Sequence, residues 1–251
     1  MKDVRSLFVT LLLLLLSAPA ALAVEGEFFD YRIDDQTFEG YLISPASGAP
    51  LVLLVHDWDG LTDYEVKRAG MLAELGYAVF AIDMFGKGVR PTARADKKKL
   101  TGALYQDRER MRHLLRGAIN EARKKGLNLD NAVVMGYCFG GAVVLELARS
   151  GADFKGFVSF HGGLAIPEGQ DYSRTRGSVL VFHGSADKAV SMAQFATMAE
   201  DLEKHDVRHE MTTYGGAPHA FSVFGSNRYR KDADHKSWRR FVTYLQETLN
   251  P

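Results

Sequence analysis

The stretch Gly136-Tyr-Cys-Phe-Gly-Gly141 constrains the fold more than any other part of this sequence. It holds the only cysteine of the chain, Cys138, and joins a strand-like run, 132–135, to a helix-like run, 142–149. A strand followed by G-x-S-x-G and a helix is a nucleophile elbow, here with sulfur in place of the serine hydroxyl. The glycines avoid clashes of β-carbons in the sharp turn, and the positive end of the helix dipole favours a thiolate. The pattern predicts an exposed, reactive cysteine; the alternative is a small buried cysteine at a tight turn.

The N-terminus, residues 1–23, has the features of a secretory signal peptide. Two basic residues precede an apolar run, 7–16, and the small-residue site Ala21-Leu-Ala23 follows. An uncleaved membrane anchor is the alternative, but a transmembrane helix needs roughly 20 apolar residues, which is more than this run offers. We therefore expect cleavage between Ala23 and Val24, no stable membrane anchor afterwards, and a periplasmic or secreted protein.

Composition limits the function classes that residues 24–251 can serve. Hydrophobic residues make up 46% of the chain, which is ample for the core of a single α/β domain. The full chain has no net charge, and removing Lys2, Asp3 and Arg5 leaves −1, so there is no basic field for nucleic acid. A single cysteine cannot form an intramolecular disulfide, so an exported fold of this kind must be stable without one.

Apolar strand-like runs alternate with amphipathic helical patterns along most of the chain. Short β-branched runs at 51–55, 77–82, 132–135, 157–160 and 179–182 predict strands that are buried on both faces, and 210–214 predicts a last strand. Helical periodicity covers 65–75, 107–125, 192–202 and 234–249, and two antiparallel strands are expected near 27–33 and 38–44. This alternation predicts an α/β fold with a mostly parallel central sheet and helices on both faces, whose site lies at the carboxyl ends of the strands.

The segment 86–104 is the least regular part of the sequence. It is rich in Lys, Arg and Gly and contains Pro91, so we expect a surface loop or cap near the mouth of the site. The run Lys97-Lys-Lys99 is interpreted as a solvated face.

Three residues at strand ends follow the chain order nucleophile, acid, histidine that this kind of elbow requires. Cys138 comes first, Asp187 lies shortly after the strand 179–182, and His219 lies in a Gly/Pro-rich loop before the final helix. In this hypothesis Cys138 attacks a carbonyl carbon, His219 transfers protons and Asp187 orients the imidazole. The alternatives are a turn aspartate and a structural loop histidine. Two backbone N–H groups would bind the developing oxyanion: that of Phe139, and that of Trp58 after the strand 51–55.

With these pieces assembled, the chain resembles the dienelactone hydrolase family. The matching segments are Val55-His-Asp-Trp-Asp-Gly60, Asp83-Met-Phe-Gly86, the elbow 136–141, 183–187 and His219-Ala-Phe-Ser222. The resemblance implies an α/β-hydrolase fold and a Cys-His-Asp triad that hydrolyses small esters or enol-lactones through an acyl-enzyme, without a cofactor or metal. A monomer or a small homo-oligomer is expected.

The resemblance also implies a role for Asp57. In the family a carboxylate at this position contacts the resting thiol and helps to activate it, but the usual residue is glutamate, one methylene longer. A turn aspartate is the alternative. The family also holds a substrate carboxylate with arginines, but the residues right after His219, 220–223, include no arginine where the family pattern has one nearby. Arg90 and Arg94 are candidates by location alone, so dienelactone itself is not the expected substrate.

Three other functions remain open from the sequence. A metal-dependent hydrolase could use His56, His161, His183 and His219, all at strand ends, although no H-E-x-x-H spacing is present. His183, followed by glycine, is instead interpreted as a residue that hydrogen-bonds the backbone of its loop. A non-catalytic or redox-sensing scaffold would use Cys138 as an oxidisable thiol. A thioesterase or acyltransferase would use the same site on a different acyl group.

Overall fold

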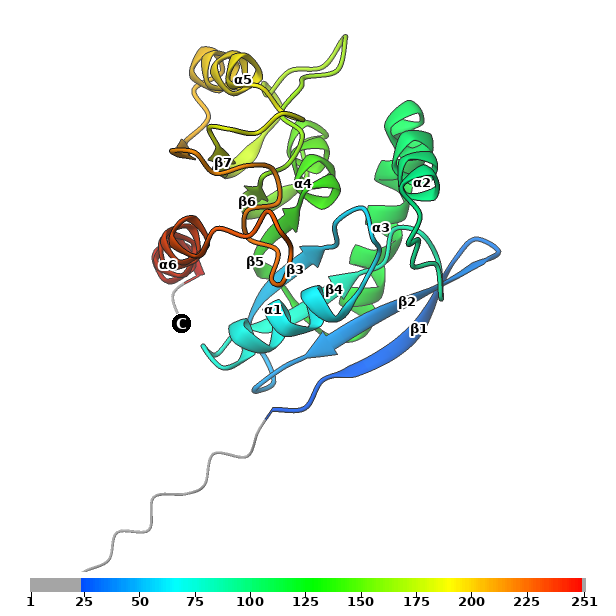
Figure 1. Ribbon diagram of the computed structural model, residues 1–251. Helices are drawn as coiled ribbons and strands as arrows, with labels where there is room; N and C mark the ends of the chain where they lie inside the picture. Colours follow the sequence, from blue (N-terminus) through cyan, green and yellow to red (C-terminus); the bar gives the residue numbers. More distant parts are fainter. Residues whose placement is uncertain (1–23, 250–251) are drawn as a thin grey trace, which may run out of the picture.

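The computed structural model describes residues 24–249, which build one eight-stranded sheet flanked by helices (Figure 1). The signal peptide proposed for 1–23 lies outside the described residues. The strands are β1 (Glu27–Ile33), β2 (Gln36–Ile43), β3 (Pro50–Val55), β4 (Ala78–Ile82), β5 (Asn128–Tyr137), β6 (Asp153–Phe160), β7 (Arg176–Gly184) and β8 (His209–Tyr214). The helices are α1 (Asp63–Ala73), α2 (Arg94–Gln106), α3 (Arg108–Lys124), α4 (Phe139–Arg149), α5 (Met192–Lys204) and α6 (Lys231–Leu249). In this part of the chain the structure offers no helix of the length and apolarity that a membrane span needs.

The sheet has the order β1-β2-β4-β3-β5-β6-β7-β8. The pairs β1–β2 and β2–β4 are antiparallel, and every other neighbouring pair is parallel. A mostly parallel sheet preceded by two antiparallel strands is the arrangement predicted from the sequence. Because β3, β5, β6 and β7 run the same way, the residues that follow them meet at one edge of the sheet.

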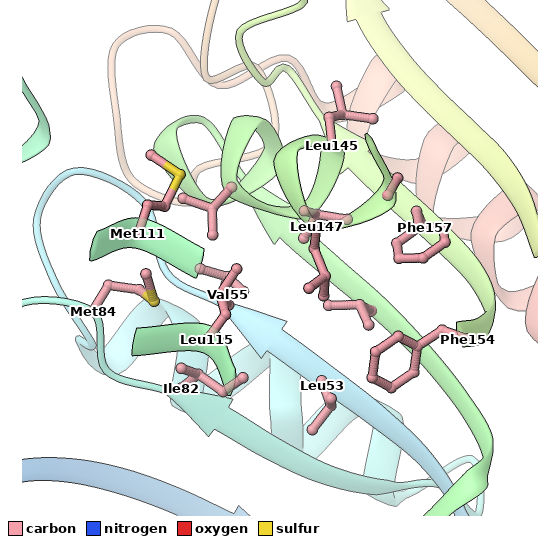
Figure 2. Packing of buried hydrophobic residues seen from close by; sticks show 14 of the residues in the cluster. Leu53, Val55, Ile82, Met84, Met111, Leu115, Leu145, Leu147, Phe154 and Phe157 are labelled. Carbon is pink, nitrogen blue, oxygen red and sulfur yellow. The ribbon is translucent and has the colours of Figure 1, made fainter. Parts of the chain in front are cut away.

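Two hydrophobic clusters, one on each face, hold the layers together. On one face Leu53 and Val55 of β3 pack with α3, α4 and α5, and on the other Val52 and Leu54 pack with α1 and α6. Successive residues of β3 therefore face opposite sides of the sheet, and residues 51–55 are all fully buried, which explains the unbroken apolar run. Figure 2 shows the first cluster, with Met111 and Leu115 of α3 close to Val55 and with Leu145 and Leu147 of α4 above the strands.

The segment 86–104 is not the irregular loop expected from its composition. Helix α2 begins at Arg94 and occupies more than half of the segment, so the prediction of a surface loop was wrong for residues 94–104. The residues after Pro91 are mostly good helix formers, but only Thr101 and Leu104 of α2 are buried, and such a narrow buried stripe gives a weak periodic signal. The helix has no side-chain cap at Ala93, which removes the other signal that predicts a helix start.

Candidate active site

Cys138 occupies the sharp turn between β5 and α4. Its backbone angles, φ 51° and ψ −110°, lie outside the regions that residues with a β-carbon favour, at a cost on the order of 1–3 kcal/mol. The backbone N–H of Cys138 donates to Phe160 O at the end of β6, at 3.0 Å, and this bond helps to hold the strained turn. The cysteine is free and partly exposed, as the elbow interpretation requires.

The glycines around the elbow allow close packing of main chains. A β-carbon on Gly140 would lie 2.2 Å from Val55 O and 2.5 Å from His56 O, both at the end of β3. One on Gly136 would lie 2.3 Å from Gly140 C, so it would block the turn itself. The glycines thus let α4 approach the end of β3, which is where the predicted oxyanion-binding turn begins.

The structure brings Cys138, His219 and Asp187 together in one chain of hydrogen bonds. His219 Nε2 lies 3.0 Å from Cys138 Sγ, and His219 Nδ1 lies 2.7 Å from Asp187 Oδ2. The other carboxylate oxygen, Asp187 Oδ1, accepts hydrogen bonds from Ala189 N at 2.7 Å and Val190 N at 3.0 Å. The acid is thereby fixed on its loop, and it presents one oxygen to the imidazole.

This contact chain favours a positively charged imidazole between two acidic partners. Burial alone would lower the pKa of His219, but its hydrogen bonds to Asp187 and Cys138 outweigh burial and raise the pKa to about 10. Burial would raise the pKa of Asp187, but the hydrogen bond and charge of His219 hold that pKa below its usual value. The arrangement can therefore take a proton from the thiol and keep it on the ring.

Asp57 lies at the same edge, directly after His56, but it does not make the contact with the thiol that the resemblance implies. No hydrogen bond between described residues joins its carboxylate to Cys138; instead Asp57 Oδ1 accepts from Asp59 N at 2.8 Å, within its own turn. The side chain is one methylene shorter than glutamate, and it is turned toward this backbone donor. Burial and the nearby Asp59 charge raise the pKa of Asp57 to about 6, and the charge of His219 acts in the opposite direction.

A second buried acid, Glu65 of α1, lies behind Asp57 and was not singled out from the sequence. Its Oε2 accepts from Thr62 N at 2.9 Å, one of the two bonds of the capping box that starts α1, and also accepts from Thr62 Oγ1 at 2.8 Å. Its Oε1 accepts from Asp57 N at 3.4 Å. Burial, followed by the charge of Asp57, raises the pKa of Glu65 to about 8. The T-x-x-E spacing is a visible helix-start signal, but it does not reveal the contact with Asp57.

The two predicted oxyanion donors come from the start of α4 and from the turn after β3. Phe139 is the first residue of α4, where a helix leaves its N–H groups without intrahelical acceptors. Trp58 lies in the turn after β3, and the hydrogen bonds between described residues include none donated by either N–H group. Both groups therefore stay predicted oxyanion donors.

Lys97 of α2 contacts this turn, so the interpretation of the lysine run as a solvated face was wrong at its first residue. Lys97 Nζ lies 2.5 Å from Asp59 Oδ1 and 5.3 Å from the centre of the Trp58 ring, whereas Lys98 and Lys99 are exposed. The helix α2 that the sequence did not reveal explains the difference, because it turns one lysine of the three inward.

Arg90 of the segment 86–104, and Tyr105 directly after it, make contacts near the site. Arg90 donates to Leu61 O, and to Glu39 Oε2 at 3.4 Å, so its guanidinium connects the segment before α1 to strand β2. Tyr105 packs edge-on against Phe139, with ring centres 5.6 Å apart, and burial and then the charge of Cys138 raise its pKa well above the usual range. Tyr105 is another residue near the site that sequence reasoning missed, because it lies on α2. Arg94 is exposed at the start of this helix.

The other strand-end histidines have separate surroundings. His56 Nδ1 donates to Asp57 O at 2.6 Å and its Nε2 accepts from Met84 N at 3.0 Å, so both nitrogens are used by the main chain. His161 Nε2 lies 2.9 Å from Ser222 Oγ. His183 is buried without a hydrogen-bond partner among the described residues, so the prediction that it bonds the loop backbone was wrong. Within 24–249 no three His, Cys, Asp or Glu side chains are grouped as a metal site.

Comparisons with known proteins identify the family and the fold. Residues 38–249 match the family model described as "Dienelactone hydrolase family". A protein of Bradyrhizobium sp. named "Probable 2-oxo-3-(5-oxofuran-2-ylidene)propanoate lactonase" is 22% identical, and the alignment covers 90% of this chain and 96% of that protein. The solved structure m3DLH is 30% identical with a TM-score of 0.83 and covers 91% of this chain and 100% of its own. A dienelactone hydrolase-like promiscuous phosphotriesterase from metagenomic libraries is 28% identical with a TM-score of 0.85, at the same coverage.

Proposed function

The chain belongs to the dienelactone hydrolase family and is a hydrolase of esters or lactones, and we propose that it cleaves them through Cys138, His219 and Asp187 by way of an acyl-enzyme. The observation that carries this proposal is the unbroken contact chain from Sγ to Nε2, 3.0 Å, and from Nδ1 to the carboxylate, 2.7 Å. A thiol with a base in contact, and a base with an orienting acid, are the parts that nucleophilic catalysis needs.

The steps follow from the positions of these groups. Cys138 transfers its proton to His219 Nε2, and the sulfur attacks the carbonyl carbon of the substrate. The negative charge on the carbonyl oxygen is stabilised by the N–H groups of Phe139 and Trp58, each worth roughly 3 kcal/mol in comparable sites. The tetrahedral intermediate collapses, His219 protonates the departing alkoxide oxygen, and a thioester to Cys138 remains. Water, deprotonated by His219, then hydrolyses that thioester and releases the acid.

For Asp57 we propose an electrostatic role rather than direct contact with the resting thiol. Asp57 is 7% exposed at the edge of the site, and its raised pKa, about 6, lets its charge change near neutral pH. Asp57→Asn fixes the neutral form with nearly the same shape. A kcat/KM profile whose acidic limb near pH 6 disappears in Asp57→Asn supports the role, and an unchanged profile contradicts it.

A turnover screen tests the proposed reaction. Purified protein is assayed on short p-nitrophenyl esters, γ- and δ-lactones and acyl thioesters, with one phosphotriester added because of the metagenomic neighbour, and Cys138→Ala serves as the blank. Ester or lactone turnover that is absent from the blank, with a mass increase on Cys138 equal to the acyl group, supports the mechanism. Turnover that persists in Cys138→Ala contradicts it, and turnover of thioesters alone favours the thioesterase alternative.

We also propose that the protein is exported after cleavage between Ala23 and Val24. The proposal rests on the charged start, apolar run and A-x-A site of the sequence. N-terminal sequencing of protein recovered outside the cytoplasm should begin at Val24; recovery of full-length protein from the cytoplasm contradicts it.

A further inference from the structure

The loop that carries His219 contacts a buried polar cluster, and this cluster has no part in the proposed reaction steps. We call the cluster formed by Tyr64, Arg68, His161, Ser222 and Asp234 the buried relay. Its members come from α1, from the end of β6, from the His219 loop and from α6, and four of the five are less than 3% exposed or fully buried. Tyr64, the fifth, is partly buried.

Ser222 is the centre of the buried relay. Its Oγ lies 2.9 Å from Tyr64 OH and 2.9 Å from His161 Nε2. Its carbonyl oxygen accepts from Arg68 Nη2 at 2.9 Å. One residue, three positions after His219, is thus bonded through its side chain and its main chain to two elements that are distant in sequence.

Arg68 anchors the buried relay, because its charge is paired and its guanidinium is held in place. Its guanidinium pairs with Asp234 at the start of α6, and Tyr229 OH donates to the second oxygen of that carboxylate at 3.0 Å. The guanidinium also lies 4.1 Å from the centre of the Phe224 ring and 4.9 Å from that of Trp238. A buried cation that is paired and stacked in this way has little freedom to move, so it is a rigid anchor for the Ser222 carbonyl.

His161 carries the restraint from Ser222 to the imidazole of His219. The two histidine rings meet edge to face, with centres 5.4 Å apart and an interplanar angle of 64°. His161 is fully buried, and burial followed by the nearby His219 charge lowers its pKa well below the usual value, so the ring is neutral. The neutral His161 ring, fixed by Ser222 Oγ, packs against the charged His219 ring and restricts it to one orientation.

We propose that Ser222 is a positioning residue for the reaction: through Tyr64, Arg68 and His161 it fixes the His219 loop so that Nε2 points at Cys138 Sγ. The proposal rests on the role given to His219 above. Ser222 touches neither the thiol nor a substrate in this scheme; its effect passes through the second imidazole. A displacement of the His219 ring by about 1 Å is enough to reduce a rate by about 100-fold in a well-oriented site.

The test is Ser222→Ala with Ser178→Ala as its matched control. Ser178 is likewise a buried serine whose Oγ contacts a tyrosine hydroxyl, that of Tyr244 at 2.7 Å, but it lies in the first half of β7, away from the thiol end. Both variants lose one buried hydroxyl and one tyrosine contact, so a purely structural effect lowers Tm in both. Positioning predicts that kcat falls about 10-fold or more in Ser222→Ala with KM little changed, while Ser178→Ala keeps the wild-type kcat.

A second readout separates this proposal from the proposed function. The rate at which iodoacetamide alkylates Cys138 depends on the contact with His219 and needs no ester substrate. Slower alkylation in Ser222→Ala than in Ser178→Ala supports positioning even if no tested ester turns over. Equal alkylation and equal kcat in the two variants overturn it. If Ser222→Ala does not fold, Tyr64→Phe with Tyr244→Phe as control decides the question in the same two assays.

Discussion

Replacing Asp187 with Asn tests how much the hydrogen bond to His219 contributes. Asp187 Oδ1 accepts from two backbone N–H groups, so an asparagine places its oxygen there and turns its amide toward His219 Nδ1. An amide N–H cannot accept from Nδ1–H, and the imidazole must move its proton to Nε2, which then faces Cys138 Sγ as a donor. In a serine enzyme the same change lowers kcat about 10⁴-fold, which is about 5.5 kcal/mol of transition-state stabilisation. Because a thiol is more acidic than a hydroxyl, we expect a loss of about 10²- to 10⁴-fold here.

The assay is kcat/KM for the best ester of the screen, with Asp201→Asn as the control. Asp201 also accepts a backbone bond, from Tyr172 N at 3.0 Å, and lies 3.6 Å from a histidine, but it is on α5. The control should keep the wild-type rate. A loss of less than about tenfold in Asp187→Asn, in a protein with wild-type Tm, would refute the assigned role, because it leaves less than about 1.4 kcal/mol for that bond.

The same variant has a signature in the dependence of stability on pH. The pKa of His219 is raised to about 10, so its charged form stabilises the fold fully below the unfolded value, about 6.5, and this contribution is lost as pH rises toward 10. Asp187→Asn removes one of the two partners that raise the pKa. The decline of the free energy of unfolding between pH 7 and pH 10 should therefore be smaller in the variant, and parallel curves would contradict this.

Four further substitutions give separate tests. Cys138→Ser should keep Tm but lose at least about 100-fold in kcat, since a serine hydroxyl is a far weaker acid for the same imidazole; comparable p-nitrophenyl acetate turnover would count against thiolate chemistry. Gly140→Ala should lower stability by about 3 kcal/mol or more, because its β-carbon meets Val55 O at 2.2 Å, whereas Gly70→Ala, with open space in α1, should raise it by about 0.5–1 kcal/mol; urea unfolding of both variants shows whether backbone contact is the cause. The pKa of Glu65 is raised to about 8, so the free energy of unfolding of the wild type should fall as pH rises from about 4.5 to about 8. Glu65→Gln should remove this slope, and identical slopes in the two proteins would mean that Glu65 is ionised throughout.

The sequence revealed what depends on local spacing. The elbow is read from neighbouring residues, because the glycines that avoid clashes lie within three positions of Cys138. The meeting of Cys138, Asp187 and His219 could be predicted because each follows a strand of the sheet, and parallel strands bring their carboxyl ends to one edge. These are contacts that fold topology forces.

The parts that the sequence did not reveal depend on contacts between distant segments. Lys97 turns toward Asp59 only because α2 forms and packs over the turn after β3. Ser222 contacts Arg68 across 154 positions, and nothing in either neighbourhood signals the partner. Asp57 shows a different limit: the missing methylene was visible, but whether the shorter side chain would still reach the thiol depended on where its own turn placed Asp59 N.

The four histidines at this edge of the sheet differ in the direction of their pKa shifts, and burial and contacts explain the difference. Burial is the largest influence on the pKa of His56, His161 and His183, and it lowers all three. His219 is also largely buried, yet its pKa is raised, because it alone of the four contacts both an ionised carboxylate and the thiol. A second protonated imidazole in contact with His219 would oppose its positive charge and weaken proton transfer from Cys138. The burial that keeps His161 neutral and the contact of His219 with Asp187 therefore have the same effect. Both favour the protonated form of His219, the ring that faces the sulfur.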